Sequence, residues 1–221
     1  MEIYENILFK GINKDDCMRM IDCFHSTLKS YENGELIPSS YVSEHRIGIV
    51  LKGNAVVVKY DINGNRTIFE NLEKNSVFGE LFTFTNSERS SFEIICESDC
   101  TVVFIAYSEI TKRCSKACKC HSMVVENMLE LLSSKTMQLS ERIEVLTQRT
   151  TTEKLMSYLN IIEEKTPRGI QPEIPFSTTA LSDYLCVNRS ALQREISKLK
   201  SNGVLKLSKR KFKIINYDSK E

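Results

Sequence analysis

Residues 178–199, TTALSDYLCVNRSALQREISKL, constrain the fold of this chain more than any other stretch. Between two apolar blocks, Val187 is placed for a tight turn that buries one side chain, and Asn188 is a favourable N-cap for a following helix. The apolar residues recur at helical spacing, first as Leu181 and Leu185 and then as Leu192, Ile196 and Leu199. The pattern therefore predicts a helix, a tight turn and a second helix.

The second predicted helix carries a polar outward face in its first turns. That face consists of Arg189, Ser190, Gln193 and Arg194. A helix with Arg, Ser and Gln near its N-terminus, braced by another helix, can enter the major groove of DNA. A helical hairpin with a solvated polar face is the alternative interpretation.

Charge is distributed unevenly along the chain. The whole sequence has 30 Lys+Arg against 29 Asp+Glu, whereas residues 189–213 hold nine basic residues against one acid, Glu195. A local cationic segment of this kind suits contacts with phosphate. After the turn signal at residues 202–203, the stretch VLKLSKRKFKIIN predicts two short strands, the wing of a winged helix. The basic residues at its tip, which are candidates for contacts with the DNA backbone, are Lys209, Arg210 and Lys211.

The first half of the chain divides into two regions. Residues 1 to about 30 have apolar residues at helical spacing, as far as Leu28, and predict helix. Residues 31–108 read as short strands separated by turns, with a clear hairpin of strand 55–60, a turn at Asn63-Gly64 and strand 66–70. Short strands in regular succession indicate an all-β sandwich or roll.

Residues 118–147 form one long helical pattern without Gly or Pro. Its seam, spaced by threes and fours, consists of Val125, Met128, Leu132, Lys135, Leu139, Arg142 and Leu146. Such a seam is typical of a helix that pairs with a second copy in a parallel homodimer. Packing of the helix on its own domain is the alternative. A further helix is expected at 151–164, before a loop at residues 166–169.

Composition narrows the class of protein. No apolar run approaches the ~18 residues of a membrane span, and the N-terminus has no signal-peptide pattern, so we expect a cytoplasmic protein without membrane contact. The eight cysteines are then expected to be reduced. An enzyme on a cupin-like roll needs clustered metal ligands, and the three histidines, His25, His45 and His121, form no such cluster in the sequence. The sequence therefore argues against an enzyme.

A cysteine-rich segment precedes the long helix. Cys114, Cys118 and His121 have the spacing of one helix face, while Cys120 points elsewhere. Three thiols and an imidazole could hold Zn²⁺ or an iron–sulfur cluster, and His121 could ligate haem. Buried packing of small thiols, or redox sensing, are the alternatives. No metal site is assigned from this segment.

Two motifs occur in an order that is typical of a known family. They are VFGELFTFTNSERSS at 77–91 and LSDYLCVNRSALQREISKL at 181–199. Over nearly its whole length the chain resembles the Crp/Fnr family of bacterial transcription regulators. The first motif resembles the phosphate cassette of cyclic nucleotide-binding domains, and the second resembles the family's helix-turn-helix. The resemblance implies an α+β fold with a jelly-roll β-roll sensor at 1–117, a dimerisation helix at 118–147 and a winged helix-turn-helix at 148–221.

The resemblance also implies an effector site in the β-roll. Gly79 would let backbone approach the ligand, Glu80 would accept a hydrogen bond from a ribose hydroxyl, and Arg89 would pair with a cyclic phosphate. Ser90, Leu81 and Ser140 complete this candidate set. The loop between Glu80 and Arg89 is about one residue shorter than in members that bind cyclic AMP, and it carries bulky rings at Phe82 and Phe84. A structural Glu80–Arg89 ion pair is therefore the alternative, and a cyclic nucleotide, another small effector or no ligand all stay open.

For DNA, the resemblance assigns Arg189 and Arg194 to contacts with guanine and phosphate. Ser190 stands where the best-known members have Glu, so the operator should differ from theirs. Thr178 and Thr179 suit phosphate contacts. The remaining candidate DNA-binding residues are Asn188, Gln193 and Lys198. The implied function is a homodimeric transcription regulator that binds pseudopalindromic double-stranded DNA and contacts RNA polymerase. A ligand-binding adaptor that uses its winged helix for protein contacts is the alternative.

Overall fold

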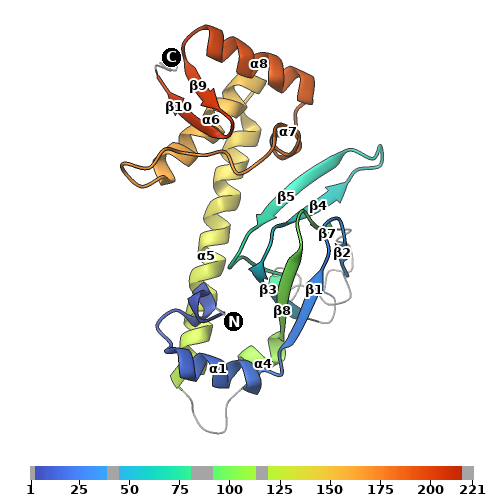
Figure 1. Cartoon of the computed structure of the whole chain (residues 1–221), viewed down its shortest axis with the longest axis vertical. Helices are drawn as coiled ribbons and strands as arrows, with labels where there is room; N and C mark the ends of the chain where they lie inside the picture. Colours follow the sequence, from blue (N-terminus) through green and yellow to red (C-terminus); the bar gives the residue numbers. More distant parts are fainter. Residues whose placement is uncertain (1–2, 39–44, 81–91, 113–118, 216–221) are drawn as a thin grey trace. The chain divides into compact units, whose positions relative to one another are not determined.

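The computed structural model describes residues 3–38, 45–80, 92–112 and 119–215 (Figure 1). The chain divides into two compact units, Met1–Ser134 and Lys135–Glu221. The first unit contains the strands β1 to β8, and the second contains the helices α6 to α8 with a small hairpin. No helix in the described ranges combines the length and apolar character needed to cross a membrane.

Two antiparallel sheets form the β-roll of the first unit. Within the described residues, one sheet has the order β1-β8-β3-β6 and the other has the order β2-β7-β4-β5. The strands of the first sheet are β1 (Thr27–Tyr31), β3 (Arg46–Lys52), β6 (Val77–Phe78) and β8 (Cys100–Ala106). Those of the second are β2 (Leu36–Ile37), β4 (Ala55–Tyr60), β5 (Arg66–Leu72) and β7 (Phe92–Cys96). The predicted all-β roll is confirmed.

The β4–β5 hairpin forms where the sequence predicts it. Asp61 organises the turn, because its Oδ1 accepts hydrogen bonds from the backbone N–H groups of Asn63 and Asn65, each at 2.8 Å. Gly64 supplies the positive φ of 78° that the turn requires. The hydrogen bonds from Asn65 and Asn63 favour the ionised carboxylate and lower the pKa of Asp61.

Apolar side chains from both sheets fill the space between them. Phe78 and Phe104 meet edge to face with 6.0 Å between ring centroids. The Phe78 ring lies so close to Gly48 that a Cβ built there would be 2.2 Å from it, so glycine is required at this point of β3. This close packing places Val77 and Phe78 firmly at the edge of the first sheet, directly before Gly79 and Glu80.

The N-terminal region departs from the predicted helix. Short 3₁₀ turns, η1 (Ile3–Glu5) and η2 (Ile7–Phe9), precede α1 (Lys14–Cys23). The chain then leaves the helix through His25, at φ 47°, and enters β1. Leu28 lies in that strand opposite Val103 and is 56% exposed. The prediction of helix to residue 30 is therefore wrong, because strand pairing overrides the helical spacing of the apolar residues.

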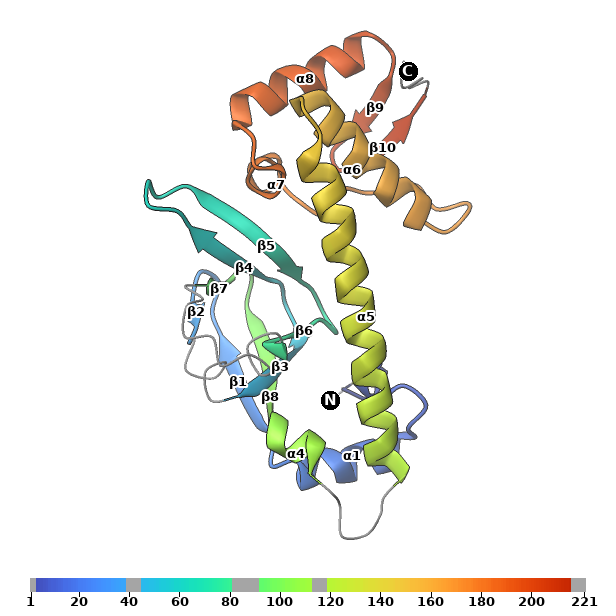
Figure 2. The same cartoon turned by 180° about the vertical axis from the view of Figure 1, so that it is seen from behind.

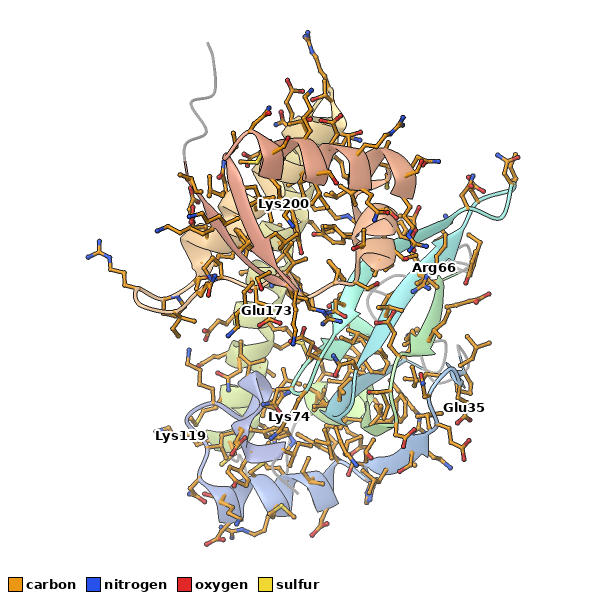
Figure 3. All side chains as sticks on the ribbon, turned by 45° about the horizontal axis from the view of Figure 1, so that its top comes forward. Glu35, Arg66, Lys74, Lys119, Glu173 and Lys200 are labelled. Atoms are coloured by element: carbon orange, nitrogen blue, oxygen red, sulfur yellow. The ribbon has the colours of Figure 1, made fainter. Side chains whose placement is uncertain are left out.

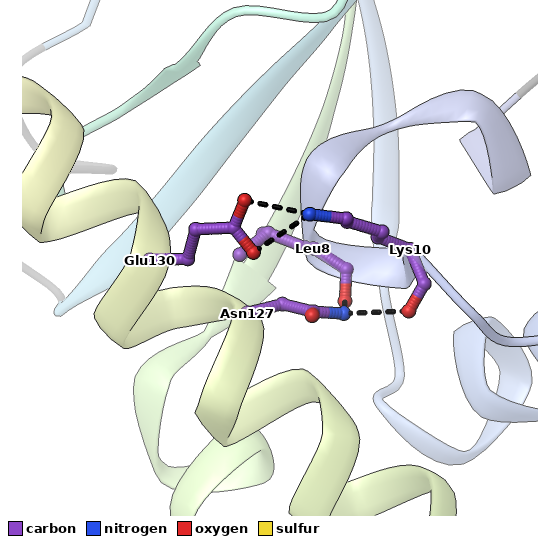
Figure 4. A network of polar contacts seen from close by, with 4 residues as sticks. All are labelled: Leu8, Lys10, Asn127 and Glu130. Carbon is purple, nitrogen blue, oxygen red and sulfur yellow. Dashed lines mark hydrogen bonds and ion pairs between the residues drawn. The ribbon is translucent and has the colours of Figure 1, made fainter.

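A second apolar core joins the N-terminal turns, α1 and the start of the long helix α5 (Lys119–Thr147) to the outer face of the first sheet. The short helix α4 (Tyr107–Thr111) lies at the end of β8. Polar contacts fix the register of α5 against the N-terminus (Figure 4). The Asn127 side-chain amide donates to the carbonyls of Leu8 and Lys10 at 3.0 and 2.9 Å. Lys10 Nζ also lies 2.7 Å from Glu130 Oε1.

The long helix predicted at 118–147 is confirmed over Lys119–Thr147, but its predicted seam is partly wrong. Met128 is only 5% exposed because it belongs to the second apolar core, and Arg142 is only 8% exposed. Four of the exposed apolar residues of α5 lie on a different stripe, and the exposed Met137 lies off it. We define this outer stripe as Val125, Leu129, Leu132, Thr136, Leu139 and Ile143, which are spaced by fours and threes and are exposed except for the half-buried Leu132.

The second unit contains α6 (Thr151–Lys165), α7 (Thr178–Leu185), α8 (Arg189–Ser201) and the hairpin of β9 (Leu205–Ser208) and β10 (Lys211–Ile214) (Figure 2). Thr150 and Glu153 form a reciprocal capping box that starts α6. The core residues supplied by these helices and strands are Leu155, Leu159, Leu181, Leu185, Leu192, Leu199, Leu205 and Phe212. The order of helices followed by a hairpin is that of a winged helix-turn-helix.

Candidate nucleic-acid interface and sensor site

The helix-turn-helix is built by two N-caps and a tight turn. Ser177 Oγ accepts a hydrogen bond from Ala180 N at 3.2 Å and begins α7. Asn188 Oδ1 accepts from Ser190 N at 2.9 Å and begins α8, as the sequence predicts. Asn188 thereby satisfies backbone donors that a helix N-terminus otherwise leaves unpaired.

The turn between the two helices depends on Cys186, which the sequence analysis did not single out. Cys186 adopts a left-handed conformation with φ 53° and ψ 48° at the end of α7. Val187 N then donates to the Ser182 carbonyl at 3.0 Å, which closes the helix end. Val187 is half-buried in this turn. Glycine is the usual residue in such a conformation, so the sequence contained no local signal for it.

The first turns of α8 present an open polar face. Its members Arg189, Ser190, Gln193, Arg194 and Lys198 are all exposed. The Ser190 hydroxyl donates to Asn188 Oδ1 at 2.6 Å, so its oxygen remains able to accept from a base. The one acid of this segment, Glu195, points the other way and accepts from the Thr152 hydroxyl at 2.6 Å. The outward face of α8 therefore contains no acidic side chain.

The start of α7 and the tip of the wing are also exposed to solvent. Thr178, Thr179, Lys209, Arg210 and Lys211 are all exposed. Arg210 also has a structural contact, because its guanidinium donates to the Pro175 carbonyl at 3.2 Å. The backbone of Glu173, which lies in the segment before α7 and is labelled in Figure 3, forms an antiparallel β-bridge with the backbone of Lys211 in β10. The wing is thus tied to the helix-turn-helix rather than projecting from it alone.

An aromatic cluster connects the helix-turn-helix to the end of α5. Tyr184 of α7 packs against Phe176 and Tyr158, with ring centroids 4.9 and 5.2 Å away. The Arg142 guanidinium of α5 lies 4.6 Å from the centroid of the Tyr184 ring. Burial raises the pKa of Tyr184, and the neighbouring positive charge of Arg142 opposes that shift. Sequence reasoning assigned Arg142 to the dimer seam and missed this cluster.

Only part of the predicted effector site lies in the described residues. Glu80 is buried at the end of β6, and Gly79 before it has φ 86°. A Cβ at Gly79 would lie 2.8 Å from the Arg46 carbonyl oxygen, so the packing of the roll itself requires this glycine. Ser140 is exposed on α5. Leu81, Phe82, Phe84, Arg89 and Ser90 lie outside the described residues.

The cysteine-rich segment is likewise described only in part. Cys120 is half-buried, and His121 is buried with its ring edge-to-face against Phe24, at 5.3 Å between centroids. Cys114 and Cys118 lie outside the described residues. Within the ranges that are described, no three His, Cys, Asp or Glu side chains are grouped so that they could hold a metal ion.

The chain is similar to known proteins in sequence and in fold. Residues 28–117 match the family model described as "Cyclic nucleotide-binding domain". A search of curated protein sequences found no match. FixK2 from Bradyrhizobium japonicum is 19% identical with a TM-score of 0.62, covering 86% of this chain and 93% of that one. The regulator CLP from Xanthomonas campestris is 14% identical with a TM-score of 0.67, covering 90% and 100%.

A third solved structure, a transcriptional regulator of the CRP/FNR family from Thermus thermophilus, is 16% identical with a TM-score of 0.58 and covers 86% of this chain and 94% of the other. Coverage this complete includes the roll, the long helix and the winged helix-turn-helix together. The chain has the Crp/Fnr regulator fold. The expected fold class is confirmed. In this fold α8 is the second helix of the helix-turn-helix, and its exposed polar face is the face described above.

Proposed function

We propose that the chain is a homodimeric, sequence-specific, DNA-binding transcription regulator of the Crp/Fnr type. The observation that carries the proposal is the exposed polar face at the N-terminal end of α8, which is braced by α7 and capped by Asn188. Arg, Ser and Gln side chains at the start of such a helix have the hydrogen-bonding groups that read base edges in a major groove. The similar fold of two transcription regulators, CLP and the Thermus thermophilus protein, supports a regulator rather than an enzyme.

In this proposal the contacts with DNA divide into two kinds. The residues that contact bases are Arg189, Ser190, Gln193 and Arg194. Ser190 replaces the carboxylate of the best-known family members, so the operator sequence should differ from theirs. The residues proposed to hold the sugar–phosphate backbone are Thr178, Thr179, Asn188, Lys198, Lys209, Arg210 and Lys211. Their number predicts a strong dependence of affinity on salt.

The outer stripe of α5 supports a homodimer. Leu129 and Ile143 are 61% and 62% exposed, and Leu139 lies between them on the same face. An apolar stripe with alternating spacings of three and four residues is the seam of a parallel coiled coil. A second copy of α5 is therefore the proposed occupant, and its two-fold symmetry requires an operator with two inverted half-sites.

The roll is proposed to sense an effector or a redox state. We assign residues 1–117 to this sensor, 118–147 to the dimerisation helix and 148–221 to DNA binding. Binding in the roll would shift the dimer helices and so change the separation of the two α8 helices. RNA polymerase is the proposed protein partner, and the cytoplasm is the proposed location. The adaptor alternative gives no reason for the basic, acid-free face of α8.

The proposal is tested with a duplex selected from a random-sequence library by the purified protein. Fluorescence anisotropy should show that Arg194→Ala weakens binding to this duplex by about 1–3 kcal/mol. Lys200→Ala, which removes an exposed positive charge at the other end of α8, serves as the control and should weaken binding much less. Equal losses for the two variants would contradict the assigned reading face, and binding to no duplex would refute the function.

A further inference from the structure

Two cysteines flank the connection between β7 and β8, outside the cysteine-rich segment of the sequence. Cys96 is the last residue of β7 and Cys100 is the first residue of β8, so one belongs to each sheet. Their exposed fractions are 1% and 2%, and both side chains belong to the core between the sheets. Only residues 97–99 separate them, so the chain crosses from one sheet to the other between the two thiols.

The two cysteines lie beside one backbone segment, Asn54-Ala55. The Cys100 thiol donates to the Asn54 carbonyl oxygen at 3.2 Å. Ala55, the next residue, lies opposite Cys96 in the β4–β7 ladder, so the backbone holds both cysteines beside the same turn. Both cysteines are free thiols.

Three turns pack together around this pair and hold it in place. Gly34 N donates to the Cys96 carbonyl at 2.7 Å, and Cys96 N donates to the Glu35 carbonyl at 3.0 Å. Asn54 N donates to Ser98 Oγ at 2.8 Å. A Cβ at Gly53 would lie 2.2 Å from the Asp99 carbonyl oxygen, so the turns are in close contact. Glu35 is labelled in Figure 3.

We propose that Cys96 and Cys100 are a modification site that forms a disulfide linking the two sheets of the roll. The co-reactant is a low-molecular-weight disulfide. The thiolate of one cysteine attacks it, a mixed disulfide forms, and one small thiol leaves. The second cysteine then displaces the other small thiol, so two protein thiols become one S–S bond and the small disulfide is reduced to two thiols.

The environment of the pair sets how this reaction proceeds. Burial above all, together with the neighbouring Cys100 and the Glu35 carboxylate, raises the pKa of Cys96 to about 12, so the thiol form dominates in the folded roll. Attack therefore proceeds when the packed turns open. Once formed, the buried disulfide is shielded from reductants in the same way, and oxidation should reverse slowly in the folded protein.

The position of Glu97 between the two cysteines makes the test direct. The full-length protein is incubated with glutathione disulfide under native conditions, the remaining thiols are alkylated after denaturation, and the chain is cleaved after glutamate. Cleavage after Glu97 separates Cys96 from Cys100, so a disulfide between them holds two peptides together at a mass about 2 Da below their sum. The expected result is this linked pair, absent after reduction.

Two variants serve as controls. Cys96→Ala should give no linked pair and leave Cys100 alkylated or as a mixed disulfide with glutathione, whereas replacing the exposed Cys23 and Cys186 by Ser should leave the linked pair intact. Thermal unfolding provides a second measurement. The oxidised protein should have a higher unfolding midpoint than the reduced protein, and Cys96→Ala should lose that difference. Complete alkylation of both cysteines after incubation, or a disulfide from either one to another cysteine, would overturn the proposal.

Discussion

Arg142 of the long helix lies over the Tyr184 ring of the helix-turn-helix, with 4.6 Å between the guanidinium carbon and the ring centroid. Arg142 is only 8% exposed, and Tyr184 is packed against Phe176 and Tyr158 on its other sides. A planar guanidinium stacks on an aromatic face in a way that an ammonium cannot. This contact therefore links the orientation of α7 directly to the last turns of α5.

Removing the guanidinium should loosen that link. Arg142→Leu is expected to lower the free energy of unfolding by about 1–2 kcal/mol, because the cation–π contact is desolvated. Arg142→Lys keeps the charge, loses the planar stacking, and should recover only part of the loss. Urea denaturation of both variants, and of each combined with Tyr184→Leu, measures the coupling between the two residues. Additive losses in this cycle would show that the contact contributes nothing.

The outer stripe of α5 gives a prediction about assembly. Leu139→Asp places two carboxylates against each other in the proposed seam and should raise the dimer dissociation constant by roughly tenfold or more. Gln138→Asp introduces the same charge at the neighbouring exposed position, off the stripe, and is the matched control. Sedimentation velocity distinguishes the two variants. A Leu139→Asp protein that sediments as the same dimer as the unchanged chain would place the seam elsewhere.

Those features of the fold that depend on local signals could be predicted from the sequence. The β4–β5 hairpin follows from Asn63-Gly64, and the start of α8 follows from Asn188. The end of α1 could not be predicted, because the apolar spacing continues to Leu28 while the backbone breaks at His25.

Features that depend on tertiary contacts could not be predicted from the sequence pattern. Met128 and Arg142 fit a heptad as well as their neighbours do, and only the packing of α5 against its own chain shows that they face inward. The placement of Cys96 and Cys100 beside the same turn has a similar cause. A spacing of four residues does not reveal that one thiol belongs to each sheet and that both point into the core.

The capping box at the start of α6 predicts a pH-dependent stability. Hydrogen bonds from Thr150 lower the pKa of Glu153 from 4.5. Because the folded-state pKa is lowered, this stabilisation is present above pH 4.5 and is lost as the pH falls through the folded-state value. Glu153→Gln should therefore lower the unfolding midpoint at neutral pH, and the difference should shrink in acid.

Thermal unfolding followed by circular dichroism at a series of pH values tests this expectation. Glu164→Gln changes an exposed carboxylate near the other end of α6, where a negative charge opposes the helix dipole, so it should cause no loss at neutral pH. A Glu153→Gln difference that is the same at neutral and acidic pH would contradict the role assigned to the ionised carboxylate.

The N-cap of α8 gives a prediction that connects stability to DNA binding. Asn188→Ala removes the acceptor for Ser190 N and Ala191 N and should cost about 1 kcal/mol of stability. It also frees the Ser190 hydroxyl, so affinity for the selected duplex should fall together with stability. Asn188→Asp retains the acceptor and should preserve the cap. Full affinity in a stable Asn188→Ala protein would show that the cap does not position the reading face.

The central claim is that two copies of the chain read inverted half-sites through α8. It is tested most directly by sequencing duplexes that the purified protein enriches from a random library and then measuring the stoichiometry on the enriched duplex by sedimentation equilibrium. The account predicts two inverted half-sites with centres about 10 base pairs apart, occupied by two protomers. Enrichment of no sequence, or binding of a single protomer to a site without two-fold symmetry, would contradict it.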